Sequence, residues 1–410
     1  MKTMKKRLII SIVLTVAIIL AGVIPAFAAE PTTNQEADAD VLNSSVIVPT
    51  MDFTGKTISL SLAGAAERMK STGPGYDAAV LARDLTLAAA KGYAESWNYM
   101  QSVSRMIQQG NVRAANPAQS IDAKVIEITR PYLTNQATIG FDIALAQLEH
   151  DTIKSYYNVL LAQDNLRISQ DNLRVQNEIL ENTNKKFELG VSAKMDVLLA
   201  ESAMQDALTT VNENENTLKS ARMGFNFQLN YPLMQNVAFT DSLVRARPLI
   251  LNLKSAISDA FTNRNELNIV EYNLQKALLQ RESVSAYPGD SSTVLNADLE
   301  IKKYQMQLES QRTSIEMDIR GRFMKLDSLN AAIFALDKTV SNAQEAYRLA
   351  SLSYEAGMQT LVDVQSAQLN SYRAQLARAA QIAEYDLAVY ELNYATGIGL
   401  TSAAQQQNPQ

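Results

Sequence analysis

The chain has 410 residues, no cysteine and a formal net charge of −6, and 47% of its side chains are hydrophobic. The lack of cysteine excludes disulfides, cysteine-based metal sites and a lipid-bearing cysteine, so packing alone must stabilise the fold. Its acidic balance makes nucleic acid and anionic lipid poor candidate partners.

The N-terminus is typical of a secretory signal peptide. Basic residues precede an apolar run from Leu8 to Ile24, and Ala26-Phe27-Ala28 forms a small-residue cleavage site. We expect residues 1–28 to be removed, although a run of about 17 residues leaves an uncleaved anchor open. Removal leaves 33 basic against 43 acidic residues in a chain exported to the extracytoplasmic cell envelope.

Residues 29–57 are polar and weakly periodic, which predicts an extended leader, and residues 401–410 are predicted to be a disordered tail. From Ile58 onward the chain is rich in Ala, Leu, Gln, Asn and Glu, with few internal prolines, as in helices. The first helix is predicted from Ile58 to about Gln108, with a break near Gly73-Pro74-Gly75. A corresponding helix is predicted from Leu249 to about Ala286.

The chain also contains one long internal repeat with an offset of 167 residues. FELGVSAKMDVLLA, which begins at Phe187, aligns without a gap with YEAGMQTLVDVQSA, which begins at Tyr354. This repeat is far longer than a solenoid unit, so it describes two copies of one large block. We predict repeat 1 at residues 58–235 and repeat 2 at residues 236–400.

Apolar residues recur every seven positions on both sides of a glycine in each block, which predicts coiled-coil hairpins with arms of about 33 residues. The turns are expected at Gly190 and Gly357. In the first block the rows are Val159, Leu166, Leu173, Leu180 and Phe187, then Val197, Met204, Val211, Leu218 and Phe225. In the second they are Leu326, Ile333, Val340, Tyr347 and Tyr354, then Val362, Leu369, Leu376, Ala383 and Tyr390.

The twice-occurring motif of an aromatic residue, a glycine three residues on, and then Asp-Val and an alanine resembles the TolC family of outer-membrane efflux proteins. The resemblance covers the chain from Ile58 to about Leu400. It implies a homotrimeric conduit with a helical barrel, whose hairpin tips meet an adaptor (membrane fusion) protein, and an ABC or other inner-membrane pump that supplies energy. The adaptor-facing tip residues it implies are Phe187, Gly190, Val191, Tyr354, Gly357 and Met358.

The resemblance also implies an acidic pore constriction, for which Asp363, Gln359, Ser366 and Asp196 are the candidates. Two of them depart from the family: Ser366 stands where a second acidic residue is expected, and Gln359 stands where an arginine is expected. From the residues alone, Thr360 and Asp363 form a capping box at a helix start, so Asp363 can serve as a cap, as a gate, or as both. Asp196 lacks that spacing from Ser192, so it is expected to favour a helix start by charge.

The resemblance further implies four membrane strands per protomer, two in each block, and this sequence does not offer suitable segments for them. Only YPGDSSTV separates the helix ending near Ala286 from the next one near Leu295. The segment Gln109–Thr134 is long enough for a strand pair, but its best strand, IDAKVIEIT, carries charge on both faces. We therefore predict an all-α TolC-like protomer with little or no β-strand and doubtful membrane association. Gln109–Thr134 itself could be a cap, a short strand or disordered.

No motif for phosphate binding, metal binding or nucleophilic catalysis is present, so neither an enzyme nor a cofactor or metal site is predicted. His150 is expected at a surface or helix seam, and Trp97 in helix packing. The first hypothesis is a passive export conduit that works with a separate pump and adaptor. The alternative is a non-conducting envelope scaffold or adaptor-binding bundle. If the source cell has an outer membrane and the strand count is wrong, the chain would lie in that membrane.

Overall fold

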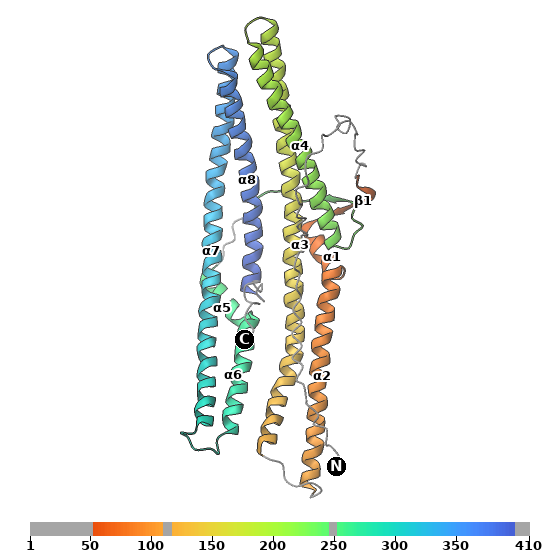
Figure 1. Ribbon diagram of the computed structural model, residues 1–410, viewed down its shortest axis with the longest axis vertical. Helices are drawn as coiled ribbons and strands as arrows, with labels where there is room; N and C mark the ends of the chain where they lie inside the picture. Colours follow the sequence, from red (N-terminus) through yellow and green to blue (C-terminus); the bar gives the residue numbers. More distant parts are fainter. Residues whose placement is uncertain (1–51, 110–116, 246–251, 398–410) are drawn as a thin grey trace, which may run out of the picture. The chain divides into compact units, whose positions relative to one another are not determined.

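A computed structural model describes residues 52–109, 117–245 and 252–397. All of these lie in one compact unit, Met51–Gln410, and most are helical (Figure 1). The predicted signal peptide, most of the predicted leader and the predicted C-terminal tail lie outside the described residues.

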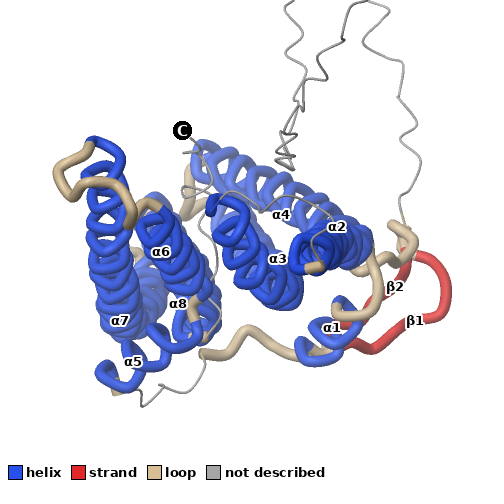
Figure 2. Tube along the Cα trace, turned by 90° about the horizontal axis from the view of Figure 1, so that it is seen from below, coloured by secondary structure: helices blue, strands red, loops and turns tan. Residues whose placement is uncertain are grey.

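The first block begins with a strand, which corrects the helix predicted from Ile58. Strand β1 (Thr54–Leu60) pairs in parallel with β2 (Gln235–Phe239), and Ile58 lies opposite Val237 in the register. Figure 2 shows the two strands beside α1 (Leu62–Met69). The helix starts late because Ser61, in an extended conformation, accepts a hydrogen bond from the Gly64 N–H and caps α1.

Three long helices follow: α2 (Pro74–Gln108), α3 (Pro117–Glu188) and α4 (Lys194–Gln228). The α3 helix has 72 residues, about twice the predicted arm, because most of the segment with unassigned conformation, Gln109–Thr134, is helical. The stretch IDAKVIEIT belongs to α3, so it is not a strand. Residues 110–116 lie outside the described part of the chain.

The second block contains α5 (Leu253–Asn263), α6 (Asn265–Ser283), α7 (Ser292–Glu355) and α8 (Leu361–Thr396). The single helix predicted from Leu249 to Ala286 is therefore wrong, because Arg264 breaks it with an extended backbone (φ −76°, ψ 125°). Turns and bends without a strand occupy residues 284–291 between α6 and α7.

Within each block an apolar seam joins the hairpin arms. Tyr156 of α3 and Phe225 of α4 are fully buried, edge to face, with ring centroids 5.9 Å apart. The predicted α4 row has Val197, Val211 and Phe225 buried.

The predicted row in α8 is only partly buried: Val362 is 57% exposed and Leu369 is 43% exposed, whereas Ala383 is buried. The row two positions later is more deeply buried, at Val364, Ser371, Tyr385 and Leu392, with only Arg378 of that row exposed. Val364 is the counterpart of Val197 at an offset of 167, so the repeat gives the correct register. The search for apolar residues at seven-residue spacing missed this row because two of its buried residues, Ser371 and Tyr385, carry polar groups.

The contact between the two blocks is mostly polar. One face of α3 meets α6, α7 and α8 through hydrogen bonds, an ion pair and a ring stack along most of its length. From one end to the other these pairs are Lys124–Glu282, Thr129–Tyr272, Tyr132–Tyr272, Gln136–Asn265, Asn172–Gln368 and Lys186–Tyr354. Apolar contact joins the blocks near the hairpin tips, where Ile179 and Ala200 of the first block cluster with Ala350, Leu361 and Val364 of the second.

His150 of α3 lies at a helix seam, as predicted, in the contact between the two blocks. It is a titratable group of this contact. Its Nδ1 lies 3.3 Å from Asp151 Oδ1, and its Nε2 lies 3.6 Å from Glu391 Oε1 of α8. Arg322 and Lys325 of α7 also pair with Glu391. The hydrogen bond to Asp151, followed by the interaction with Glu391, raises the pKa of His150 from 6.5 to about 9.

We expect the free energy of unfolding to fall as the pH rises from about 6 to about 9.5. Because the pKa of His150 is higher in the folded chain than in the unfolded chain, the protonated imidazole stabilises the folded state. This contribution is complete below the unfolded pKa of 6.5 and is lost as the pH passes about 9. At about 1.4 kcal/mol per pKa unit the loss is at most about 3 kcal/mol. Urea unfolding at the two pH values measures it. The His150→Gln variant should show a smaller difference, and an unchanged difference would contradict the assignment.

Candidate functional site

The candidate site is the pair of hairpin turns, which lie next to each other at one end of the helices (Figure 1). Gly190 and Gly357 have φ values of 73° and 77°, a left-handed conformation that glycine adopts without strain. The Val191 N–H donates to the Lys186 carbonyl (2.9 Å), and the Met358 N–H donates to the Ser353 carbonyl (2.8 Å). Both are helix C-terminal turns closed by a glycine.

The tips expose apolar side chains to solvent. Val191 is 72% exposed and Met358 is 75% exposed, and Phe187 is also exposed. Leu189, which the sequence analysis did not select, is exposed as well. Exposed apolar side chains at a rigid tip suit contact with another protein.

Tyr354 differs from the other predicted tip residues because it points into the contact between the hairpins. Lys186 Nζ donates to the Tyr354 carbonyl (2.6 Å) and lies 3.7 Å from the centre of the Tyr354 ring. The Thr183 hydroxyl is 3.5 Å from the Tyr354 hydroxyl. Lys186 and Thr183 were missed by the sequence analysis, because nothing in a helical repeat shows which side chains face the other block.

At the start of α8, Asp363 and Thr360 form the predicted capping box. Asp363 Oδ2 accepts from the Thr360 N–H (3.0 Å) and from its hydroxyl (2.7 Å), and the Asp363 N–H donates to Thr360 Oγ1 (3.3 Å). The Thr360 hydroxyl, followed by its N–H, lowers the pKa of Asp363. The carboxylate is fully exposed and remains charged near neutral pH.

Asp196 acts at the start of α4 by more than the predicted charge effect. Its Oδ2 accepts hydrogen bonds from the Ser192 hydroxyl (2.8 Å) and from the Ala193 N–H (3.1 Å). The sequence analysis did not predict these hydrogen bonds, because the N-cap residue, Ala193, has no side-chain acceptor with which to complete a capping box.

Three of the four constriction candidates line one groove between α7 and α8 next to the tip. Gln359, Asp363 and Ser366 face it, together with Asn342 and Asn370, and its volume is about 560 Å³. Asp196 does not line this groove. The remaining lining is small, mostly alanine, so the groove is polar and open enough for water or for the side chains of a partner helix.

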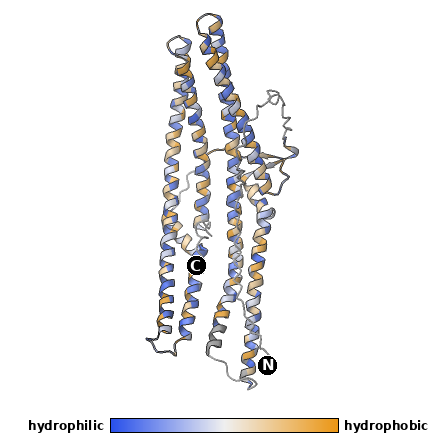
Figure 3. Ribbon diagram, viewed as in Figure 1, coloured by the Kyte–Doolittle hydropathy of each residue, from blue (hydrophilic) through white to orange (hydrophobic). Residues whose placement is uncertain are grey.

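The described helices alternate between apolar and polar residues along their length (Figure 3). Within residues 52–109, 117–245 and 252–397, no helix combines the length and apolarity needed to span a bilayer. The same residues contain no group of acidic and histidine side chains arranged to bind a metal ion.

Solved structures with this arrangement include bacterial outer membrane channels. The Campylobacter jejuni CmeC outer membrane channel superposes with a TM-score of 0.63 and 10% identity, covering 92% of this chain and 96% of that one. The chain therefore shares the fold of that structure.

The sequence comparisons show similarity to efflux proteins. The outer membrane efflux protein family model matches residues 144–230. Nodulation protein T of Rhizobium leguminosarum bv. trifolii is 24% identical over 327 residues, which is 66% of this chain and 69% of that protein. Outer membrane protein TolC of Vibrio cholerae is 22% identical over 290 residues, or 60% of this chain and 66% of that protein. Over these residues the chain is similar to the TolC family of outer membrane efflux proteins.

Proposed function

We propose that the chain is a passive conduit of an export system in the cell envelope, closed as a ring of three copies. A separate pump, of the ABC or another inner-membrane class, supplies the energy, and an adaptor protein meets the hairpin tips. The family supports this proposal, and the observation that carries it is an exposed apolar surface at each edge of the protomer.

The first edge is a row of exposed apolar residues on α7, which we name the α7 stripe. At 100° per residue its members fall within about 40° of one another around the helix. Each is at least 50% exposed: Leu295, Leu299, Met306, Met317, Met324 and Leu349. A stripe this long on a monomer would leave apolar surface in water along most of a 64-residue helix.

The second edge is α2, which packs mainly on α3 while α7 packs mainly on α5, α6 and α8. Leu81, Leu85, Tyr99 and Met106 of α2 are exposed and lie within about 60° around that helix. A cyclic ring brings one edge of each copy against the other edge of the next, so closing the ring would bury both surfaces.

The exposed face of α8 suits a water-filled lumen. Ser366, Asn370, Arg373, Ala377 and Glu384 are exposed along it, and all are small or polar. In a ring of three copies, Asp363 with Ser366 and Gln359 would converge near the tip, with Asp196 on the neighbouring hairpin. Three carboxylates near an axis would disfavour anions at the entrance. The tip residues Phe187, Val191 and Met358 would contact the adaptor.

Single-cysteine cross-linking tests the ring and its narrow end. The chain has no cysteine, so Ser366→Cys introduces the only thiol, and it leaves the Thr360–Asp363 cap intact. We expect a short three-armed maleimide reagent to join the copies into covalent trimers in high yield. The measurement is the ratio of trimer to monomer on a denaturing gel.

Ala377→Cys is the matched control, because it lies three turns further along α8 on nearly the same face, about 16 Å from Ser366. A lumen that widens away from the tip should give at least several-fold less trimer with this variant. Equal yields from both positions would contradict a constriction at Ser366. No cross-linking from either would contradict the ring and favour the non-conducting scaffold.

A further inference from the structure

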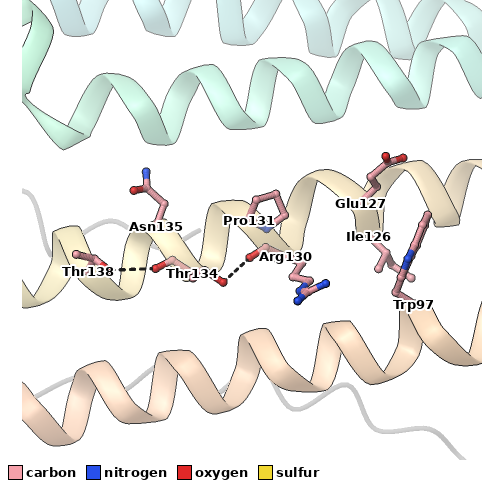
Figure 4. A pocket seen from close by; sticks show the side chains of 8 residues that line it. All are labelled: Trp97, Ile126, Glu127, Arg130, Pro131, Thr134, Asn135 and Thr138. Atoms are coloured by element: carbon pink, nitrogen blue, oxygen red, sulfur yellow. Dashed lines mark hydrogen bonds between the residues drawn. The ribbon is translucent and has the colours of Figure 1, made fainter.

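A second cavity lies between α2 and α3, in the half of the chain away from the hairpin tips. Its volume is about 620 Å³, and Trp97 of α2 lines it together with residues 126–138 of α3. Figure 4 shows Trp97 rising from α2 toward Ile126 of α3. Nothing in the proposed conduit uses this cavity.

Trp97 is the only tryptophan in the chain, and its ring is partly exposed. Among the described residues it stacks on no other ring, and its indole N–H has no hydrogen-bond partner. A tryptophan that packs helices together would bury its ring and satisfy this donor. Trp97 instead offers a flat apolar face and a free donor at the cavity wall.

The opposite wall is polar and exposed. Arg130, Thr134 and Asn135 supply donors and acceptors, and the Thr134 hydroxyl also donates to the Arg130 carbonyl (3.0 Å). Arg130 and Glu127 both line the cavity, and neither forms an ion pair with a described residue. Their hydrogen-bonding groups remain available to a ligand.

Pro131 adds a backbone acceptor to this wall. It lies inside α3 and has no N–H to donate to the carbonyl of Glu127, four residues earlier. A proline in a helix interior costs about 3 kcal/mol, so a long regular helix does not favour it. Glu127, whose carbonyl lacks its helical donor, is one of the residues that line the cavity.

We propose that this cavity binds a glycan chain. A sugar ring presents an apolar C–H face that packs on an indole, and a rim of hydroxyls that pairs with amide, hydroxyl, guanidinium and carboxylate groups. The cavity combines both features. An apolar ligand fits less well because only Trp97, Ile126 and Pro131 of the lining are apolar, and an anion fits less well because Glu127 lines the cavity as well as Arg130.

Trp97 fluorescence tests the proposal directly, because no other tryptophan contributes to the emission. The purified chain, kept free of sugar-based detergents, is titrated with soluble tetrasaccharides of N-acetylglucosamine, glucose and galactose. We expect a saturable change in emission with at least one of them, with a dissociation constant on the order of 1 mM. Calorimetry with Trp97→Ala should show at least a tenfold loss of affinity.

Thr134→Val keeps the fluorescent probe and should weaken binding several-fold. Its matched control is Thr209→Val, since both residues are exposed and donate to the carbonyl four positions earlier. Equal effects of the two variants would overturn the proposal. The proposal would also be overturned if neither fluorescence nor calorimetry detected saturable binding to a chain that remains helical by circular dichroism. It would likewise be overturned if an apolar dye bound more tightly and displaced every bound sugar. None of these results bears on the ring.

Discussion

Replacing Arg264 with alanine should lower the free energy of unfolding by about 3 kcal/mol or more. The Arg264 side chain is only 6% exposed and donates to Glu266 Oε1 (2.6 Å) and Asp318 Oδ2 (2.6 Å). Without Arg264, the nearly buried Glu266 has no cationic partner, whereas Asp318 still pairs with Arg322 at 3.0 Å. The measurement is the urea midpoint and slope, followed by circular dichroism at constant pH.

The Arg320→Ala variant is the control, because Arg320 forms an exposed pair with Glu316 on the same helix. Exposed pairs contribute at most about 1 kcal/mol. The Arg264→Met variant retains much of the aliphatic stem and separates lost packing from the unpaired acids. If Arg264→Ala and Arg320→Ala have similar midpoints, the buried network does not hold α6 against α7.

Much of the fold was predictable because the repeat encodes it. The hairpins and the turns at Gly190 and Gly357 follow from an ungapped offset and a left-handed glycine. The start of the first helix was not predictable from composition, because Ile58 joins a strand whose partner, β2, is about 180 residues away. Local propensity carries no information about such a contact.

The α8 register shows a second limit. Alanine-rich helices offer several rows of apolar residues at seven-residue spacing, and the row containing Val362 was as regular as the correct one. The buried row includes Ser371, which a search for apolar residues rejects. Aligning the second copy on the first would have placed Val364 at the seam directly.

The candidate site was predictable where its chemistry is local. The Thr360–Asp363 cap follows from spacing within one turn, and the structure confirms it. The contacts of Lys186 and Thr183 with Tyr354 were out of reach, because they depend on how two blocks more than 160 residues apart pack together. The roles of the tip and constriction residues remain proposals, and the cross-linking experiment addresses the constriction.

The α7 stripe carries the second large prediction: Met317→Glu with Met324→Glu should convert the assembly from three copies to one. Each of the three interfaces would then bury two carboxylates against apolar surface without a partner. Each buried unpaired charge costs several kcal/mol. Light scattering on the size-exclusion peak measures the mass directly, with and without a mild detergent. The unmodified chain should have the mass of three copies.

Because both methionines are 64–67% exposed in the single chain, these changes should leave the helix content and the urea midpoint of the monomer nearly unaltered. That separates lost assembly from lost folding. Gln307→Glu is the matched control, since it adds negative charge to an exposed position of α7 beside the stripe. A variant that keeps the mass of three copies would mean that the stripe faces solvent or another partner, and the ring would then need a different edge. If the unmodified chain is itself a monomer in both conditions, the apolar edges do not join copies of this chain, and the scaffold becomes the better account of the same fold.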